Sequence, residues 1–321
     1  MNIKLSFFYI KYIKKHMSKI DKTLVCCLCV RDCATFLPFI FNNLNSLSKC
    51  FVRFKVVFVY DNCSDNSETL LNYYKHNSNF DVFVINNVNN NSPYRTVRIS
   101  NSRNMCLNIV YDVIKDVDYH IMIDADDVNT NKWNIDLLLY YLNSEIDNWD
   151  ALSFNRKDYY DIWALLYGDY KYHCWGFGNL SNIVVDYMKN DIKNKLNKLK
   201  DKDDLFECFS AFNGFSIYKT KKFLNIRYDG YCSNFDTLLT PDKVINTLLV
   251  LRNNINKINL IIHKETEVCE HLCYHINSIK CNNARIRISK ESLFISEINK
   301  KYFNKQSLHP AQTGRFKLQL T

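Results

Sequence analysis

The stretch Tyr-His-Ile-Met-Ile-Asp-Ala-Asp-Asp at residues 119–127 decides the fold, and the remaining chain is arranged around it. Its apolar run, residues 119–123, predicts a buried strand that ends at a cleft, where open α/β sheets bind their ligands. Three carboxylates follow at once, on Asp124, Asp126 and Asp127. Carboxylates this close raise one another's pKa unless a cation lies between them, and hard divalent ions prefer oxygen ligands. We therefore predict that these three residues bind Mg²⁺ or Mn²⁺.

The same acidic stretch also has a purely structural interpretation. Acidic residues are common in the turn between a strand and a helix, where their side chains accept hydrogen bonds from unpaired backbone N–H groups. Asp127 or Asn129 would then cap a helix that begins near Lys132. A short acidic motif does not by itself decide between the two interpretations.

A second acidic turn occurs earlier in the chain, after another apolar run. The polar turn Asp-Asn-Cys-Ser-Asp-Asn at residues 61–66 follows a predicted strand. Strands are expected at 24–30, 54–60, 81–85 and 119–123, and helices at 31–47, 68–74 and 99–113. Such alternation predicts parallel βαβ units whose loops after each strand meet at one edge of the sheet. Asp61, Asp65 and Asp124 should therefore line one cleft.

The chain lacks the glycine-rich loops that identify dinucleotide- and phosphate-binding folds. It has 6 glycines, and the turn after the first predicted strand is Arg31, Asp32 and Cys33. The sequence therefore contains neither a Rossmann fingerprint nor a P-loop. Phosphates bound in this cleft would have to be contacted by a metal ion and by side chains.

The two acidic turns, in this order, resemble those of the nucleotide-sugar-dependent glycosyltransferases of the GT-A fold. The resemblance implies that Asp61 and Asp65 bind the nucleobase of the donor. It implies that Asp124 and its acidic neighbours bind the ribose and the divalent ion at the diphosphate. Arg103 and Asn104 stand where such enzymes often carry an Arg-Asn pair. An arginine there can form two hydrogen bonds with a phosphate, although a surface arginine on a helix has the same sequence pattern.

The second half of the chain has aromatic residues close to an acid. Residues 159–165 read Tyr-Tyr-Asp-Ile-Trp-Ala-Leu, with Asp161 and Trp163 near the middle. Sugars are bound by aromatic faces and by carboxylates that accept their hydroxyl protons, so this segment is a candidate acceptor site. Core packing explains Trp163 equally well. Residues 212–218 predict a strand that enters the cleft, where Gly214 permits a close backbone approach to a ligand.

The order of these motifs narrows the resemblance. Residues 160–163, the Asn-Gly pair at 213–214 and residues 268–271 are similar to motifs of the fungal capsule-type α-1,3-mannosyltransferases and their viral and protist relatives. The similarity covers residues 24–288 and is diffuse outside the motifs. The fuller acidic motif at 124–127, and a Glu-His pair in place of a cysteine-rich motif, depart from that family. The sugar and the linkage therefore stay open.

Cysteine and histidine alternate at positions 269, 271, 273 and 275. On a strand all four side chains would face one way, which suggests zinc. A straight strand spaces alternate residues about 6.6 Å apart, however, so four consecutive side chains cannot surround one ion. We expect instead that His271 alone reaches the divalent ion, as the resemblance to GT-A enzymes implies. A buried histidine paired with a backbone carbonyl is the alternative.

The composition is that of an ordinary globular protein. The chain has 321 residues, 47% of them hydrophobic, and a formal charge of +9 from scattered basic residues. This charge suits an acidic or phosphorylated partner, but nucleic acid is not indicated. The chain has 13 cysteines, an odd number, and its sequence has no convincing signal peptide. Together these features predict reduced thiols and a cytoplasmic protein.

The predicted organisation comprises an N-terminal extension at residues 1–22, a nucleotide-sugar-binding half at 23–150, an acceptor half of the same domain at 151–299 and a C-terminal tail at 300–321. The extension is too short and too charged to span a bilayer. It is expected to be a frayed end, with peripheral contact to a membrane surface as the alternative. Near the tail, Arg285 or Arg287 is a candidate to bind the diphosphate.

The sequence thus predicts an α/β protein of GT-A type, with a mostly parallel central sheet flanked by helices and an acceptor-binding C-terminal half. The predicted reaction moves a sugar from a UDP- or GDP-linked donor to a hydroxyl of a glycan or glycoconjugate, with the metal and Arg103 neutralising the diphosphate. Asp161 is the best candidate for the base of an inverting enzyme, with Asp236 second. A metal-dependent phosphodiesterase or nucleotidyltransferase, or a non-catalytic carbohydrate- or nucleotide-binding module, would use the same residue types.

Overall fold

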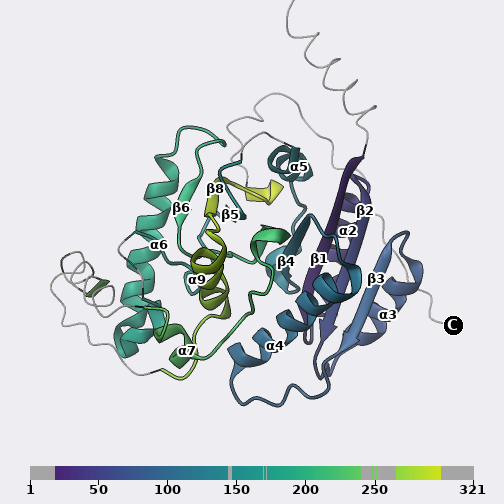
Figure 1. Cartoon of the computed structure of the whole chain (residues 1–321), viewed down its shortest axis with the longest axis horizontal. Helices are drawn as coiled ribbons and strands as arrows, with labels where there is room; N and C mark the ends of the chain where they lie inside the picture. Colours follow the sequence, from purple (N-terminus) through teal and green to yellow (C-terminus); the bar gives the residue numbers. More distant parts are fainter. Residues whose placement is uncertain are drawn as a thin grey trace, which may run out of the picture.

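The structure is a computed structural model that describes residues 19–297 except 144–146, 169, 171, 240–246, 249, 250, 252 and 254–264. Its helices lie on both sides of one central sheet (Figure 1). None of the helices in this part of the chain is long and apolar enough to cross a bilayer. Most of the predicted N-terminal extension and all of the C-terminal tail lie outside the described residues.

Eight strands form the sheet in the order β3-β2-β1-β4-β7-β5-β8-β6. Their bounds are β1 Ile20–Val30, β2 Phe51–Tyr60, β3 Asp81–Asn86, β4 Tyr119–Asp124, β5 Ala151–Asn155, β6 Phe206–Cys208, β7 Phe215–Lys219 and β8 Ile286–Ser292. Strands β3, β2, β1 and β4 are parallel, and so are β5 and β8. Only β7 and β6 run against the other strands of this described sheet. The sheet is therefore mostly parallel, as the sequence predicted.

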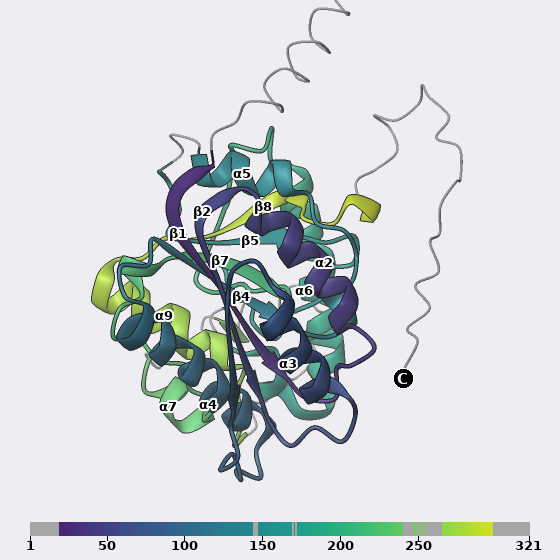
Figure 2. The ribbon, with the colours of Figure 1, turned by 90° about the vertical axis from the view of Figure 1, so that its right-hand side faces the viewer.

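Helices cover both faces of the sheet (Figure 2). Their bounds are α2 Leu37–Ser48, α3 Ser67–Asn77, α4 Arg95–Asn108, α5 Ile135–Asn143, α6 Ser181–Asn197, α7 Cys232–Asp236 and α9 Glu270–Asn282. Val25 and Cys27 of β1 belong to the core cluster that includes α4, α6 and α9. Leu24, Cys26 and Leu28 belong to the cluster that includes α2, α3 and α5. Because β1 is buried on both faces, its sequence is a continuous apolar run.

The alternation of strands and helices predicted for the first half is confirmed. The largest difference is at α2, which begins at Leu37 because the preceding residues form a turn, and Pro38 lies in its first turn. Helix α4 begins at Arg95 and continues into a π-helical segment, Ile109–Ile114, that leads to β4. The loops after β1, β2 and β4 consequently meet at one edge of the sheet.

The antiparallel strand β7 joins the two predicted halves, because it pairs with β4 on one side and β5 on the other. It is preceded by Asn213 and Gly214, which have φ values of 57° and 83°. A Cβ added to Gly214 would lie 2.5 Å from Cγ1 of Val128, so both the backbone angle and the space require glycine there. This turn brings the backbone of β7 against the acidic corner at the end of β4.

The strand considered for residues 268–275 is wrong, because the segment forms the start of helix α9. Val268, Leu272 and Ile276 recur every four positions and are buried. That helical spacing of apolar residues outweighs the alternation of cysteine and histidine. On a helix, positions 269 and 273 face one side and positions 271 and 275 another, so the four Cys and His side chains do not share one face, which removes the geometric basis for a zinc site made of all four.

Candidate active site

A cleft of about 930 Å³ lies at the edge of the sheet where β1, β2 and β4 end. Seven carboxyl groups and four guanidinium groups line it, so acids predominate. The acids are Asp32, Asp61, Asp124, Asp126, Asp161, Glu267 and Glu270. The carboxyl ends of parallel strands are where such sheets bind ligands, and the loops predicted to meet there do so.

Asp124 ends β4 and is held from both sides by backbone contacts. Its N–H donates to the carbonyl of Gly214 at 3.0 Å, and its own carbonyl accepts from Nδ2 of Asn129 at 2.9 Å. Nδ2 of Asn129 also donates to the carbonyl of Gly214 at 2.8 Å. The position of the Asp124 carboxyl is therefore set by β7 as well as by its own strand.

The electrostatic environment of Asp124 is unfavourable for a negative charge. Its pKa is raised to about 8, chiefly by burial and further by the carboxyls of Asp126, Asp161 and Glu270, against the opposing effect of Arg103. Burial also raises the pKa of Asp126. A cation among these carboxyl groups would stabilise their ionised forms.

The two remaining acids of the motif have different positions. Asp126 lines the cleft, and its Oδ1 accepts from the N–H of Val128 at 3.2 Å at the start of a short 3-10 helix. Asp127 is exposed and does not line the cleft, so its predicted place in the metal site is not supported by its position. Polar side chains do cap the helices after β4, but they are not the predicted Asp127 and Asn129. Asp126 caps the 3-10 helix, and Asn134 accepts from the N–H of Leu137 in α5.

Arg103 lines the cleft and is only 5% exposed. One terminal nitrogen lies 3.0 Å from Oδ1 of Asp124 and 3.3 Å from Oε1 of Glu270. The other lies 3.4 Å from Nδ1 of His271, and the guanidinium carbon lies 4.6 Å from the ring centre of Phe212. Both terminal nitrogens thus have partners, whereas Nε has none among the described residues, and the predicted contact of Arg103 with phosphate stays a prediction. Its neighbour Asn104 is structural, since it pairs with the backbone of Tyr228.

Glu270 lines the cleft and is not among the residues predicted from the sequence to act there. It is 5% exposed, lies in the first turn of α9 and forms the second ion pair of Arg103. The first turn of a helix favours a negative charge. The sequence signal was the helical spacing that begins at Val268, which would have placed Glu270 at a helix N-terminus.

His271 lines the cleft beside Glu270 but is almost fully buried, with 1% exposure. Its ring stacks on Phe212 at 3.8 Å between centres, and Nε2 has no hydrogen-bond partner among the described residues. Burial and the charge of Arg103 lower its pKa well below 6.5, so the ring is neutral. Because Arg103 can only donate, Nδ1 accepts and the proton lies on Nε2.

Asp61 follows β2 and lines the cleft. It is 6% exposed, and its Oδ2 accepts from Nδ2 of Asn90 at 3.1 Å. Its Oδ1 is buried without a hydrogen-bond partner among the described residues, although the residue lines the cleft. Asp65 differs, because its two oxygens accept from the N–H groups of Ala34 at 2.8 Å and Ser67 at 2.9 Å. Asp65 thus stabilises the turn and does not line the cleft.

Asp161 also lines the cleft and belongs to the segment after β5. Oδ1 of Asn213 accepts from the N–H groups of Tyr160 and Asp161, both at 3.0 Å, and its Nδ2 donates to the carbonyl of Phe154 at 2.8 Å. Oδ1 of Asp161 accepts from the N–H of Ala164 at 3.1 Å. Burial raises the pKa of Asp161 to about 6. Asn213 thus holds the backbone of Asp161, and its neighbour Gly214 holds the backbone of Asp124.

Aromatic side chains form the rim beside Asp161. Tyr160 is 46% exposed and Trp163 is 41% exposed, and both line the cleft. Trp163 packs edge-on against Trp175, another lining residue. Core packing of Trp163 is therefore ruled out, whereas a surface against which a sugar ring can pack is present.

Three predicted residues lie elsewhere. Asp236 is exposed at the end of α7 and does not line the cleft, which removes the basis for its role as second catalytic candidate. Arg285 forms ion pairs with Asp147 and Asp150, and Arg287 with Glu207. Neither arginine lines the cleft, so neither is placed to bind the diphosphate.

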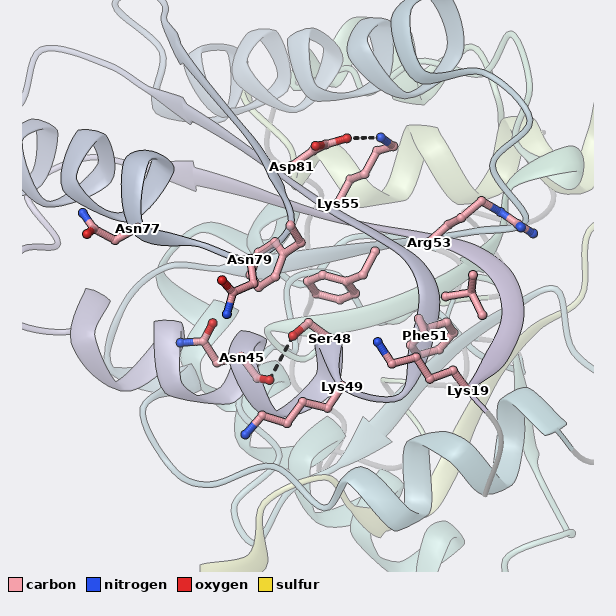
Figure 3. Close-up of a pocket in the computed structure, with 13 residues that line it drawn as sticks. Lys19, Asn45, Ser48, Lys49, Phe51, Arg53, Lys55, Asn77, Asn79 and Asp81 are labelled. Atoms are coloured by element: carbon pink, nitrogen blue, oxygen red, sulfur yellow. Dashed lines mark hydrogen bonds and ion pairs between the residues drawn. The ribbon is translucent and has the colours of Figure 1, made fainter. Parts of the chain in front are cut away.

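A second cavity, of about 740 Å³, lies at the other end of β2 and β3, where these strands begin (Figure 3). Its lining is basic, with Lys19, Lys49, Arg53 and Lys55, and its one carboxyl group, on Asp81, is paired with Lys55. This cavity lacks the set of acids that a divalent ion requires. It also lies where helices α2 and α3 end, where carbonyl groups disfavour an anion. The acidic cleft is therefore the candidate active site.

The fold and the cleft together define an α/β protein with an acid-lined site at the strand ends. No family model and no curated protein matches the chain. Among solved structures, S. aureus TarS in complex with UDP-GlcNAc matches with 10% identity and a TM-score of 0.43, covering 85% of this chain and 57% of that one. The mannosyltransferase PcManGT from Pyrobaculum calidifontis, in complex with GDP-Man and Mn²⁺, matches with 11% identity and a TM-score of 0.39, covering 70% and 54%.

Glucosyl-3-phosphoglycerate synthase from M. tuberculosis matches with 8% identity and a TM-score of 0.37, covering 75% of this chain and 69% of that one. The chain spans 54 to 59% of the TarS 1-349 and PcManGT chains. Similarities of this size concern the arrangement of the chain, and they say nothing about its substrates.

Proposed function

We propose that the chain is a glycosyltransferase that moves a hexose from a nucleoside diphosphate sugar to a hydroxyl of a glycan or glycoconjugate. The observation that carries the proposal is the convergence of Asp124, Asp126, Asp161 and Glu270 on one cleft in which Arg103 is the only buried guanidinium group among the described lining residues. The order of the motifs, which resembles that of GT-A enzymes, also supports glycosyl transfer.

A divalent ion fits this site because the buried carboxyl groups outnumber the one buried guanidinium group, so a cation would balance their charge. Asp124 and Asp126 would hold Mn²⁺ or Mg²⁺ through oxygen, the ligand type these ions prefer. When bound, the ion would neutralise the charge of the departing diphosphate. Because the pKa of Asp124 is raised to about 8, binding should release a proton at neutral pH.

The donor nucleotide is proposed to bind through Asp61. Its buried Oδ1 can accept a hydrogen bond from an N–H group of the base, which would satisfy an oxygen that has no other partner. Uracil and guanine both offer such N–H groups, so UDP- and GDP-linked donors fit equally well.

The diphosphate is proposed to be met by Arg95 as well as by the ion. Arg95 is the first residue of α4, is exposed and lines the cleft, and its charge favours the ionised form of Asp126. Arg103 pairs with Asp124 and Glu270 and would therefore position Asp124, and its predicted part in neutralising the diphosphate is retained in the proposal.

The acceptor is proposed to bind on the other wall, with a sugar ring against Trp163 and its hydroxyl near Asp161. A pKa of about 6 leaves Asp161 ionised at neutral pH while keeping it basic enough to take the hydroxyl proton. This role applies to an inverting transfer. In a retaining transfer Asp161 would bind the acceptor without removing its proton.

We also propose His271 as a third metal ligand, on the condition that its contact with Arg103 opens. Its Nδ1 lone pair is directed at Arg103, so metal ligation requires that contact to open. Since the ring is neutral well below pH 6.5, acid would not compete for it in the physiological range. Titration of Mn²⁺ into wild type and His271→Asn with nucleoside diphosphate present decides the matter. Equal affinities would show that His271 is part of the core.

A phosphodiesterase is the main rival, and the products separate the two reactions. The protein should be incubated with a panel of UDP- and GDP-linked sugars and Mn²⁺. Slow hydrolysis of one donor to free sugar and nucleoside diphosphate would support transfer. Release of nucleoside monophosphate would establish the phosphodiesterase instead, and binding without turnover would establish a binding module.

A further inference from the structure

The first turn of α4 carries an unfavourable charge for its position. It contains no acid but two arginines, Arg95 and Arg98, although the N-terminus of a helix disfavours positive charge. Tyr94, the residue before the helix, provides no side-chain cap. Arg95 lines the cleft and forms no ion pair with the described residues, so its charge is available to a ligand.

A carboxylate from a distant part of the chain caps this turn. Oε2 of Glu267 accepts from the N–H of Thr96 at 2.9 Å and lies 3.0 Å from the hydroxyl oxygen of the same residue. Thr96 is the second residue of α4, a position where the N–H has no partner within the helix. The two residues are 171 positions apart in the sequence. Glu267 therefore supplies the cap that the sequence around α4 lacks.

The backbone of Gly230 lies against the same turn. Its carbonyl oxygen is 3.0 Å from the hydroxyl oxygen of Thr96, and it also accepts from the N–H of Val268 at 2.9 Å. A Cβ added to Gly230 would lie 2.5 Å from the carbonyl carbon of Thr96, so this close approach requires glycine. The segment that carries Glu267 is thus fixed to the start of α4 through backbone as well as side-chain contacts.

The same segment contacts α4 at a second point. Glu270, three positions after Glu267, pairs with Arg103 at 3.3 Å. Thr96 and Arg103 are seven positions apart, which is about two helical turns, so they face the same side of α4. Helices α4 and α9 lie side by side (Figures 1 and 2). Two acids, one just before α9 and one in its first turn, therefore hold α4 beside the cleft.

We propose that Glu267 is a positioning residue, which caps α4 and thereby fixes Arg95 for contact with the diphosphate. The role rests on the proposed function, in which Arg95 binds that group. A carboxylate at the N-terminus of α4 offsets both the partial charge of the helix end and the charge of Arg95. Without this cap the first turn would fray, and ordering Arg95 on binding would cost conformational entropy.

Direct contact of Glu267 with a ligand is the alternative. Glu267 lines the cleft, and its Oε1 accepts no hydrogen bond from the described residues. A positioning residue acts only through Arg95, whereas a residue that contacts the ligand acts independently of it. The two roles are separated by combining the substitutions, because effects that share one route are not additive.

Calorimetric titration of UDP and of GDP, each with Mn²⁺, into four proteins measures this dependence. The proteins are wild type, Glu267→Ala, Arg95→Ala and the double variant. Glu267→Ala should weaken binding of the preferred nucleotide about fivefold, the effect of a lost helix cap. Arg95→Ala should weaken it at least about tenfold, the effect of a lost hydrogen bond to a charged group. In the Arg95→Ala background, the further loss from Glu267→Ala should be below about twofold.

Two further variants make the result specific. Glu267→Gln keeps an oxygen that can accept from the N–H of Thr96, so its affinity should stay within about twofold of wild type. Glu265 lies two positions earlier and does not line the cleft, so Glu265→Ala should bind as wild type does. Hydrogen exchange at the N–H of Thr96 should accelerate in Glu267→Ala but not in Glu265→Ala, because only the first substitution removes its acceptor.

The outcomes distinguish this role from the proposed function. Unchanged nucleotide affinity in Glu267→Ala, or an equal fivefold loss in the Arg95→Ala background, would overturn the positioning role and leave the proposed function intact. Unchanged hydrogen exchange at Thr96 would overturn the cap itself. Failure of wild type to bind either nucleotide would contradict the proposed function, and the positioning role with it.

Discussion

Replacing Arg103 by methionine should destabilise the protein strongly and make its stability depend on a divalent ion. Arg103 is 5% exposed and lies between the carboxylates of Asp124 and Glu270, at 3.0 and 3.3 Å. Methionine fills a similar volume and keeps the contact with Phe212, so the main change is the loss of the positive charge.

The magnitude follows from the burial of the partners. Glu270 is 5% exposed, so its carboxylate is poorly solvated when the cation is removed, whereas Asp124, with a pKa of about 8, is largely protonated at neutral pH and leaves no unpaired charge. Removing one partner of a buried ion pair typically costs about 3–5 kcal/mol. We expect a loss in this range at neutral pH, with a smaller loss for Arg103→Lys, which keeps the charge but not the forked geometry.

Urea unfolding of wild type, Arg103→Met and Arg103→Lys with and without Mn²⁺ measures the effect. An ion at 100 times its dissociation constant stabilises a protein by about 2.7 kcal/mol. The gain should be larger in Arg103→Met, because the ion then replaces a missing charge. A loss below about 1 kcal/mol, or the same gain from Mn²⁺ in all three proteins, would refute the assigned role of Arg103.

Three further results are expected. Asp61→Ala should weaken nucleoside diphosphate binding by about 1–3 kcal/mol in calorimetry, because a buried hydrogen bond is lost. Burial lowers the pKa of His275 to about 3, so its contribution to stability is intact above pH 6.5 and is lost as the pH falls towards 3. At pH 5 the loss is about 2 kcal/mol, and His275→Gln should show a shallower decline in urea unfolding between pH 7 and 5. Asn213→Gly keeps the positive φ but removes the acceptor for two N–H groups, so hydrogen exchange at Tyr160 and Asp161 should accelerate and kcat should fall.

Each of these expectations has a contrary outcome. Unchanged nucleotide affinity in Asp61→Ala would exclude the base-binding role. An identical pH dependence in His275→Gln would show that the buried imidazole already titrates near 6.5. Asn213→Asp retains the accepting oxygen and serves as the control for Asn213→Gly, so equal exchange rates in the two variants would show that this contact does not hold the segment.

The first half of the fold was predictable because its information is local. Apolar runs such as that of β1 define buried strands, and polar turns separate them from helices whose direction the connection rule fixes. The position of β7 was not predictable in this way. An apolar run does not encode strand direction, and the pairing of β7 between β4 and β5 depends on residues far apart in the chain.

The same difference between local patterns and long-range pairing explains which residues of the candidate site were predicted. Residues at the ends of predicted parallel strands, such as Asp61 and Asp124, lie in the cleft because topology brings those ends together. The pairing of Arg103 with Glu270 joins positions that are distant in sequence, and no local pattern indicates it. Asp236 was misplaced for a related reason, because no pattern around it in the sequence indicates which side of the sheet helix α7 reaches.

Product analysis with two neighbouring acids tests the central claim most directly. The donor identified by the panel is incubated with Mn²⁺ and wild type, Asp126→Ala or Asp127→Ala, and the released nucleotide is measured. We predict nucleoside diphosphate from wild type and from Asp127→Ala, whose side chain is exposed outside the cleft, and a loss of about 100-fold or more in Asp126→Ala. Full activity of Asp126→Ala, or nucleoside monophosphate as the product, would contradict a metal-assisted glycosyl transfer in this cleft.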